Sequence, residues 1–99
     1  MELNDLRQLT PELQRIAQKY GISRIYVFGS TARGESTPKS DVDFLVDLDP
    51  DKSLFAVAGF AYEAQKLLGV PVDVIPSSIL AHLRDQDFVR HVRKDSVAL

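Results

Sequence analysis

The 99-residue chain contains no cysteine. This absence excludes disulfide bonds and thiolate zinc sites, and it permits a reducing compartment such as the cytoplasm. No apolar run approaches the roughly 20 residues that a membrane-spanning helix needs, and the N-terminus, Met-Glu-Leu-Asn-Asp, lacks the basic-then-apolar order of a signal peptide. We therefore expect a cytoplasmic protein without a membrane segment.

The chain also carries no excess of positive charge. The 12 Lys and Arg residues are outnumbered by 14 Asp and Glu residues, which gives a net charge of −2. Because nucleic-acid binding surfaces are basic, we expect no direct binding to nucleic acid. Apolar residues make up 44% of the chain and charged residues 26%, which is typical of a folded globular protein. The length suffices for one modest core, so residues 1–99 are expected to form a single domain.

Apolar spacing and turn residues divide the chain into helices and strands. Strands are predicted over residues 24–28, 41–48 and 71–75. Helices are predicted over residues 10–20 and 53–68, with one or two more over 77–94. Thr10 and Ser53 are the predicted caps, and Gly21 is the predicted stop of the first helix. The pattern predicts an α/β fold.

The most informative stretch joins the first two predicted strands. Gly29-Ser30 follows an apolar strand and opens a short helix-compatible turn, which offers backbone N–H groups and a hydroxyl to an anion. Asp41 and Asp43 lie on the next predicted strand, where alternation places both carboxylates on one face. Such a pair can bind one divalent ion, or two ions about 3.5–4 Å apart. The alternative is an acidic edge strand that resists aggregation.

A third carboxylate, Asp73, stands among valines in the last predicted strand. Burial of an unpaired carboxylate there would be costly, whereas a role as metal ligand or general base would use it. The alternative is an edge-strand aspartate that caps a turn. The two histidines, His82 and His91, lie far along the chain from these acids and are interpreted as solvated.

The predicted helix over residues 53–68 is apolar on nearly every side in its first half. Such a helix is either deeply buried or used in part as an interface. Because full burial is difficult in a small domain, this helix and the C-terminal helix are the candidate docking faces. An interface of this kind suits a homo- or hetero-oligomer.

In these residues the chain resembles the nucleotidyltransferase superfamily whose best-known member is DNA polymerase beta, and most closely its minimal nucleotidyltransferase branch. The resemblance covers nearly the whole chain. It is carried by these motifs in family order: Phe28-Gly29-Ser30, Arg33-Gly34, Ser40-Asp41-Val42-Asp43 and Val72-Asp73-Val74. One departure is Val70-Pro71, where relatives often have a basic residue.

The resemblance implies a small, mixed, three-stranded sheet flanked by about four helices. It also implies metal-dependent transfer of AMP from ATP to a hydroxyl, with two Mg²⁺ ions; nothing in the sequence separates Mg²⁺ from Mn²⁺. Carried over by residue, Asp41 and Asp43 would bind both ions, and Asp73 would bind one and help to deprotonate the acceptor. Gly29 and Ser30 would hold the triphosphate, with Arg33 as a second phosphate contact.

Small members of this branch are typically antitoxins. The resemblance therefore implies a helical HEPN-type toxin as partner and a tyrosine on that toxin as acceptor. Two other functions stay open. The chain could be a non-catalytic module that neutralises its partner by contact alone, or an enzyme that modifies a small molecule, which usually needs a second domain.

Overall fold

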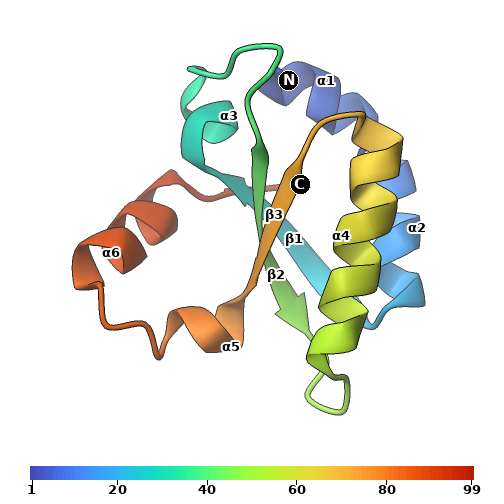
Figure 1. The fold of residues 1–99 in the computed structure, drawn as a ribbon, viewed down its shortest axis with the longest axis vertical. Helices are drawn as coiled ribbons and strands as arrows, with labels where there is room; N and C mark the ends of the chain where they lie inside the picture. The colour runs from blue at the N-terminus through green and yellow to red at the C-terminus, as the bar shows by residue number, and fades with distance from the viewer.

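In the computed structural model, which describes residues 1–99, four strands form one mixed sheet in the order β3-β2-β1-β4 (Figure 1). The central strands β1 (Ile22–Phe28) and β2 (Val42–Leu48) are antiparallel. β3 (Val72–Pro76) lies parallel to β2 at one edge, and β4 (Val97–Ala98) lies antiparallel to β1 at the other. The predicted mixed α/β sheet is confirmed, and β4 adds a fourth strand to the three expected.

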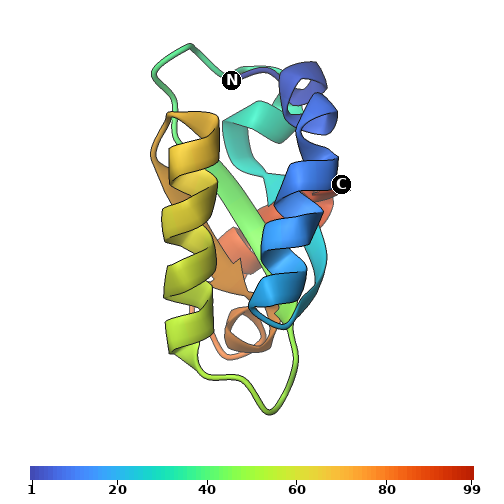
Figure 2. The same cartoon turned by 90° about the vertical axis from the view of Figure 1, so that its right-hand side faces the viewer.

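Helices cover the two faces of the sheet unequally (Figures 1 and 2). Two long helices, α2 and α4, lie side by side on one face, which we call the α2/α4 face. Two short helices, α3 and α5, lie on the other face together with the 10-residue α6, and we call it the α6 face. The helices are α1 (Leu3–Gln8), α2 (Thr10–Lys19), α3 (Gly29–Arg33), α4 (Leu54–Leu68), α5 (Ser77–Leu80) and α6 (Gln86–Asp95). Six helices thus replace the predicted four, because α1 and the short turn of α3 are also helical.

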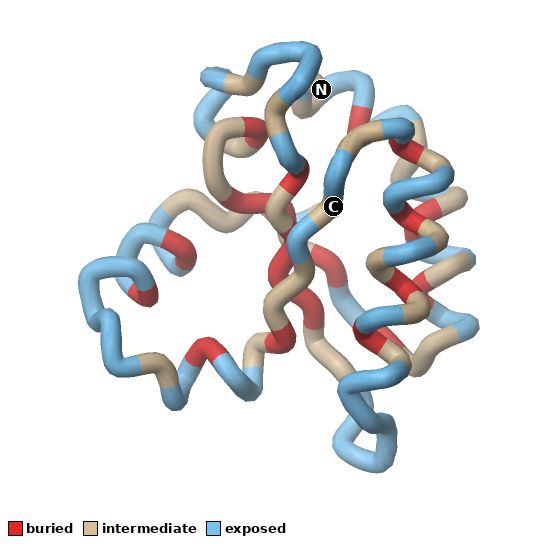
Figure 3. The backbone as a smooth tube through the Cα atoms, in the orientation of Figure 1, coloured by how far each residue is buried: buried red, intermediate tan, exposed pale blue.

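Strand alternation divides the core into two clusters, as the buried stripes in Figure 3 show. Val42, Phe44 and Val46 of β2 are fully buried against α2 and α4, and the Phe44 and Phe60 rings meet edge to face at 6.0 Å. Leu45, between them on β2, belongs to a smaller cluster beneath α6 that contains Phe28, Leu80, Val89 and Val92. The α6 face is therefore only partly apolar, and it is the face that also carries Asp43.

A polar contact clamps α2 to α4 at the surface. The Lys19 ammonium lies 2.9 Å from a Glu63 carboxylate oxygen, and the Tyr20 hydroxyl donates to the same carboxylate. Gly59, one helical turn before Glu63, faces the Tyr20 ring so closely that a Cβ there would overlap Cε1. Glycine at this position allows the tyrosine to lie flat between the two helices.

Several helix ends follow the predicted capping signals. The Ser53 hydroxyl oxygen accepts from the Phe55 N–H at 3.3 Å, and α4 ends at Gly69 with φ +73°, a left-handed conformation that glycine adopts readily. The predicted cap Thr10 is wrong by one residue, because Leu9 is the cap and Thr10 already lies in α2. Its hydroxyl instead donates to the Leu6 carbonyl, since α1 runs almost directly into α2.

The predicted burial of the apolar helix is confirmed for one side, and its predicted use as an interface stays a prediction. One side of α4 is buried, through Val57, Phe60, Ala64 and Leu68. The opposite side exposes Leu54, Phe55 and Tyr62 by 59%, 87% and 65%. This leaves an apolar strip on the outside of α4. No helix of the protein combines the length and the apolar character needed to cross a membrane.

We expect Gly59→Ala to lower the free energy of unfolding by about 1–3 kcal/mol, the usual cost of overpacking. Alanine favours a helix over glycine by about 1 kcal/mol, but here its methyl group meets the Tyr20 ring. Thermal denaturation of Gly59→Ala in the wild-type and Tyr20→Ala backgrounds measures the effect. Once the ring is removed, the same substitution should become stabilising. A destabilisation that persists without the ring would contradict the steric explanation.

Candidate active site

The strand register brings two of the predicted acids together. Asp43 on β2 is the direct partner of Asp73 on β3, and it is also the partner of Phe28 at the end of β1. Paired residues on adjacent strands point to the same face and lie about 4.8 Å apart across the sheet. Asp43 and Asp73 are therefore neighbours on the α6 face, at the end of β1 where α3 begins.

Asp41 lies just outside this pair. It is exposed and precedes β2, which starts at Val42, so its predicted place within the strand is wrong by one residue. The Val42 N–H donates to the Pro71 carbonyl at 2.9 Å, which ties the start of β2 to the segment before β3. Asp73 is also exposed, so the predicted cost of burying it does not arise. Of the three acids, only Asp43 is half-buried.

The electrostatics of Asp43 reflect this crowding. Its pKa is raised from 3.8 to about 6, first by burial and then by repulsion from Asp73 and Asp41. A hydrogen bond with Asp73 raises the pKa further, and the nearby Arg33 guanidinium lowers it. A carboxylate whose pKa is raised by neighbouring carboxylates lacks sufficient positive charge around it. The cluster is therefore suited to a cation.

Gly29 is the point of closest approach between the two halves of the site. It has φ +72° and begins α3, and a Cβ on it would overlap the Asp43 Oδ2 atom. Glycine is thus required twice, by the backbone conformation and by the neighbouring carboxylate. Ser30 follows at the start of α3 and is half-buried. The Gly-Ser turn predicted to hold phosphate lies directly beside Asp43.

Arg33 makes contacts that the sequence did not predict. Its Nη1 lies 2.8 Å from the Asp95 carboxylate and its Nε lies 3.3 Å from that of Glu35. Asp95 ends α6, so this ion pair joins α6 to α3. A contact 62 residues apart in the chain leaves no local pattern by which sequence reasoning could find it. In this arrangement Arg33 positions α3, and its predicted role as a phosphate contact remains a prediction.

The residues present fit a divalent cation that keeps open coordination positions. The protein alone brings no group of three or more His, Cys, Asp or Glu side chains together in an arrangement that could hold a metal ion. Mg²⁺ usually takes only one or two carboxylates from the protein, together with waters and substrate phosphate oxygens. The adjacent Asp43 and Asp73, with Asp41 close enough to repel them, match that requirement. His82 and His91 are both exposed on the surface, as predicted.

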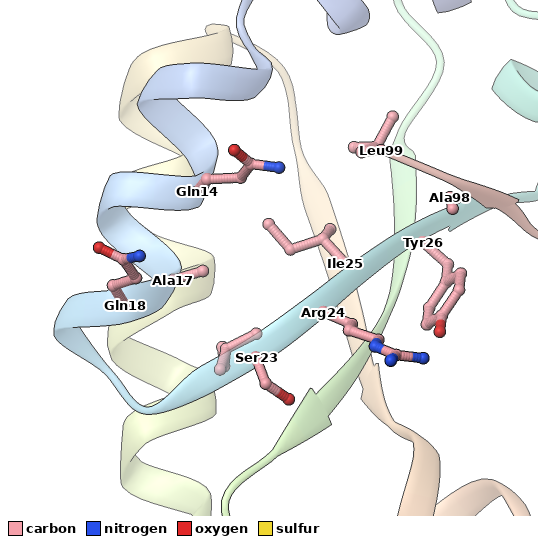
Figure 4. Close-up of a pocket in the computed structure, with 10 residues that line it drawn as sticks. Gln14, Ala17, Gln18, Ser23, Arg24, Ile25, Tyr26, Ala98 and Leu99 are labelled. Atoms are coloured by element: carbon pink, nitrogen blue, oxygen red, sulfur yellow. The ribbon is translucent and has the colours of Figure 1, made fainter.

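A cavity lies elsewhere, away from the three acids. A hollow of about 510 Å³ lies between α2 and the part of β1 that the two-residue β4 leaves unpaired (Figure 4). Its lining includes Gln14, Gln18, Arg24, Tyr26 and Leu99, and none of the three acids. The candidate active site lies at the other end of β1, outside this cavity. It is therefore identified by its carboxylates and the glycine turn, and not by a cavity volume.

Known proteins are similar to this chain over most of its length. Residues 6–98 match the family described as the nucleotidyltransferase domain. A candidate protein adenylyltransferase of Methanocaldococcus jannaschii, MJ0435, is 38% identical over 88 residues, which cover 87% of this chain and 90% of the relative. The protein adenylyltransferase MntA of Thermococcus cleftensis is 38% identical over 73% of each chain.

Solved structures share the fold. A structure described as a candidate minimal nucleotidyltransferase has a TM-score of 0.80 and 30% identity, over 100% of this chain and 97% of the other. A crystal structure described as a toxin–antitoxin with AMP-PNP has a TM-score of 0.69 and 19% identity, over 89% of this chain and 69% of the other. At that identity the second likeness concerns the fold alone.

We expect Asp43→Asn to stabilise the metal-free protein at pH 7.5 and to have little effect at pH 4. Because the folded-state pKa is raised to about 6, the contribution of Asp43 to stability is fully present below its unfolded pKa near 3.9 and is lost as the pH rises through 6. The full shift corresponds to about 3 kcal/mol. Since Asp43 is half-exposed, solvent screening reduces this to about 1 kcal/mol, or several degrees in Tm.

Thermal denaturation in a chelating buffer at both pH values measures this effect. Asp51→Asn, which removes one charge from the exposed loop after β2, is the control and should change Tm little at either pH. A lower Tm for Asp43→Asn at pH 7.5 would show that the carboxylate is stabilising, contrary to the crowding argument.

We expect Gly29→Ala to be more harmful than Gly34→Ala. Both glycines have φ near +73°, but a Cβ at Gly34 meets nothing within 4 Å, whereas one at Gly29 overlaps Asp43. Gly34→Ala should therefore cost about 1–2 kcal/mol of backbone strain, and Gly29→Ala should add the steric cost. Urea denaturation of both variants gives the difference. Equal losses would contradict the role assigned to the Asp43 contact.

Proposed function

The chain belongs to the nucleotidyltransferase domain family, and from this premise we propose that it transfers AMP from ATP to a hydroxyl group on a partner protein. The observation that carries the proposal is the placement of Asp43 beside Asp73 on adjacent strands, next to the Gly29 turn. The names of the relatives, which are protein adenylyltransferases, support the choice of AMP and of a protein acceptor.

Asp41, Asp43 and Asp73 would hold the metal in this function. Two Mg²⁺ ions are proposed, and Mn²⁺ has similar ligand preferences. Bound there, the ions would neutralise charge on the phosphates and favour ionisation of the acceptor hydroxyl. The half-buried Asp43 lies beside the exposed Asp73 of the neighbouring strand, and the exposed Asp41 is two residues earlier in the chain. Such a site recruits the ions together with the triphosphate, which supplies further oxygens.

The remaining residues would position the substrates. Gly29 and Ser30 offer backbone N–H groups and a hydroxyl to the triphosphate, at the start of α3 beside Asp43. The acceptor oxygen attacks the α-phosphorus, the bond to the β-phosphate oxygen breaks, and pyrophosphate leaves. The hydroxyl proton passes to Asp73, which is exposed on an edge strand where an acceptor can approach. Catalysis thus depends on positioning and charge neutralisation.

The acceptor is proposed to be a tyrosine of a helical toxin of the HEPN type, which would make this chain an antitoxin. Two structural neighbours are described as toxin–antitoxin structures, one of them as MntA–HpeT. Nearly all of the chain lies in the nucleotidyltransferase domain, so an acceptor supplied by a partner is consistent with its size. The exposed strip of Leu54, Phe55 and Tyr62 on α4 and the outer side of α6 are the proposed docking faces.

The alternative is an antitoxin that acts by contact alone. A pure binder would need the surface of α4 but not a half-buried carboxylate whose pKa is raised to about 6, first by burial and then by two neighbouring carboxylates. Like charges held together reduce stability, so their presence favours a catalytic role. The two functions differ in whether Asp41 and Asp43 are needed.

Calorimetric titration of ATP, with and without Mg²⁺, is the first test. We expect binding only with Mg²⁺ in the wild type, and a loss of at least about 100-fold in Asp41→Asn/Asp43→Asn, since two charged ligands are removed. The matched control is Asp49→Asn/Asp51→Asn, which removes two exposed aspartates at the same spacing after β2 and should bind as the wild type does. Equal binding by both variants would contradict the site.

A transfer assay with the co-expressed partner distinguishes the enzyme from the binder. Mass spectrometry should find AMP on the partner with the wild type and with the Asp49/Asp51 control, but not with the Asp41/Asp43 variant. Neutralisation of the partner by the Asp41/Asp43 variant without any transfer of AMP would favour the contact-only function.

A further inference from the structure

The exposed aromatic side chains are divided between the two faces of the protein. Phe55 and Tyr62 belong to α4 and lie on the outside of the α2/α4 face, away from the acids. Phe88 belongs to α6 and is 38% exposed. It is therefore the exposed aromatic residue on the α6 face, which is also the face that carries Asp43 and Asp73.

Phe88 is separated from the site by a single side chain. Its ring meets the ring of Phe28 edge to face, with centroids 6.5 Å apart and planes at 83°. Phe28 is 6% exposed, directly precedes Gly29 and is the cross-strand partner of Asp43. Phe28 thus holds Phe88 from beneath, while it also fixes the start of the Gly-Ser turn. A partly exposed aromatic ring consequently lies next to the proposed triphosphate contacts.

The orientation of α6 turns Phe88 toward α3. Asp95 lies seven residues after Phe88, and residues seven apart in a helix share a face. The Asp95 carboxylate pairs with Arg33 of α3 at 2.8 Å, so this face of α6 is directed to α3. Val89 and Val92, on the neighbouring face, are buried against the sheet. The helix is therefore anchored on two sides, through Asp95 to α3 and through Val89 and Val92 to the sheet.

We propose that Phe88 is the surface on which the purine base of the nucleoside triphosphate stacks. This inference rests on the proposed function and adds the residue that recognises the base. Only a ribose separates the α-phosphate from the base, so a base must find its contact surface close to the triphosphate. Stacking of a base on an aromatic side chain contributes about 1–3 kcal/mol. The Arg33–Asp95 ion pair then positions the stacking surface relative to the phosphate turn.

The test compares Mg²⁺-ATP with Mg²⁺-tripolyphosphate, which has the phosphates but no base. Calorimetry on Phe88→Ala should show ATP affinity reduced by about 5- to 150-fold, the equivalent of one stacked base, and tripolyphosphate affinity unchanged. Phe88→Tyr should bind ATP as the wild type does, because the ring is kept. Phe55→Ala, which removes the aromatic ring from the α4 surface, is the matched control and should change neither affinity.

Fluorescence provides a second measurement that does not require loss of the ring. The chain contains no tryptophan, so Phe88→Trp places the only tryptophan, which can be excited selectively over the tyrosines, at the proposed stacking surface. ATP should quench its emission, whereas tripolyphosphate should not. Phe55→Trp places the same emitter on α4, where neither ligand should alter it. Thermal denaturation of each variant establishes that it is folded.

The outcomes separate this inference from the proposed function. If Phe88→Ala weakens ATP and tripolyphosphate equally, or weakens neither, and ATP leaves the Phe88→Trp emission unchanged, the base lies elsewhere while nucleotide binding stands. If the wild type binds neither ligand in the presence of Mg²⁺, both the proposed function and the stacking surface are overturned.

Discussion

Repulsion between carboxylates on neighbouring strands is the constraint on which the rest of the site depends. The parallel register of β2 and β3 sets Asp43 directly against Asp73, and Asp41 adds to the same local charge. The sheet can hold this arrangement because its other face is a well-packed core, where Val42, Phe44 and Val46 are fully buried. The free energy gained by burying apolar side chains on one face of β2 thus offsets the repulsion between carboxylates on the other face.

The two faces of the sheet have different roles because successive side chains of a strand point to opposite faces. The α2/α4 face stabilises the protein and is reinforced by the clamp of Lys19, Tyr20 and Glu63. The α6 face is incompletely covered, since α3 and α5 have only 5 and 4 residues and leave room for polar groups. A single strand can therefore serve stability and chemistry at alternate residues, which is economical in a chain of 99 residues.

Much of this arrangement was predictable from local patterns. The alternation of β2, the cap at Ser53 and the order of Gly-Ser, Asp-x-Asp and a third acid depend on neighbours in the chain, so the sequence displays them directly. The strand partner of Asp73, the ion pair of Arg33 with Asp95, and the ring contact of Phe28 with Phe88 depend on how distant segments pack. Such contacts leave no periodic signal, so Arg33 was predicted only as a phosphate contact.

The mixed sheet also has a consequence for the order of folding. β1 and β2 form a local antiparallel pair, whereas β3 joins β2 only after the chain has crossed back through the 15 residues of α4. Contacts that close longer loops generally form later. A folding intermediate with β1 and β2 paired already sets Phe28 against Asp43, yet it has not met Asp73. The carboxylate cluster is therefore expected to form only after β1 and β2 have paired, when that pair can already resist the repulsion.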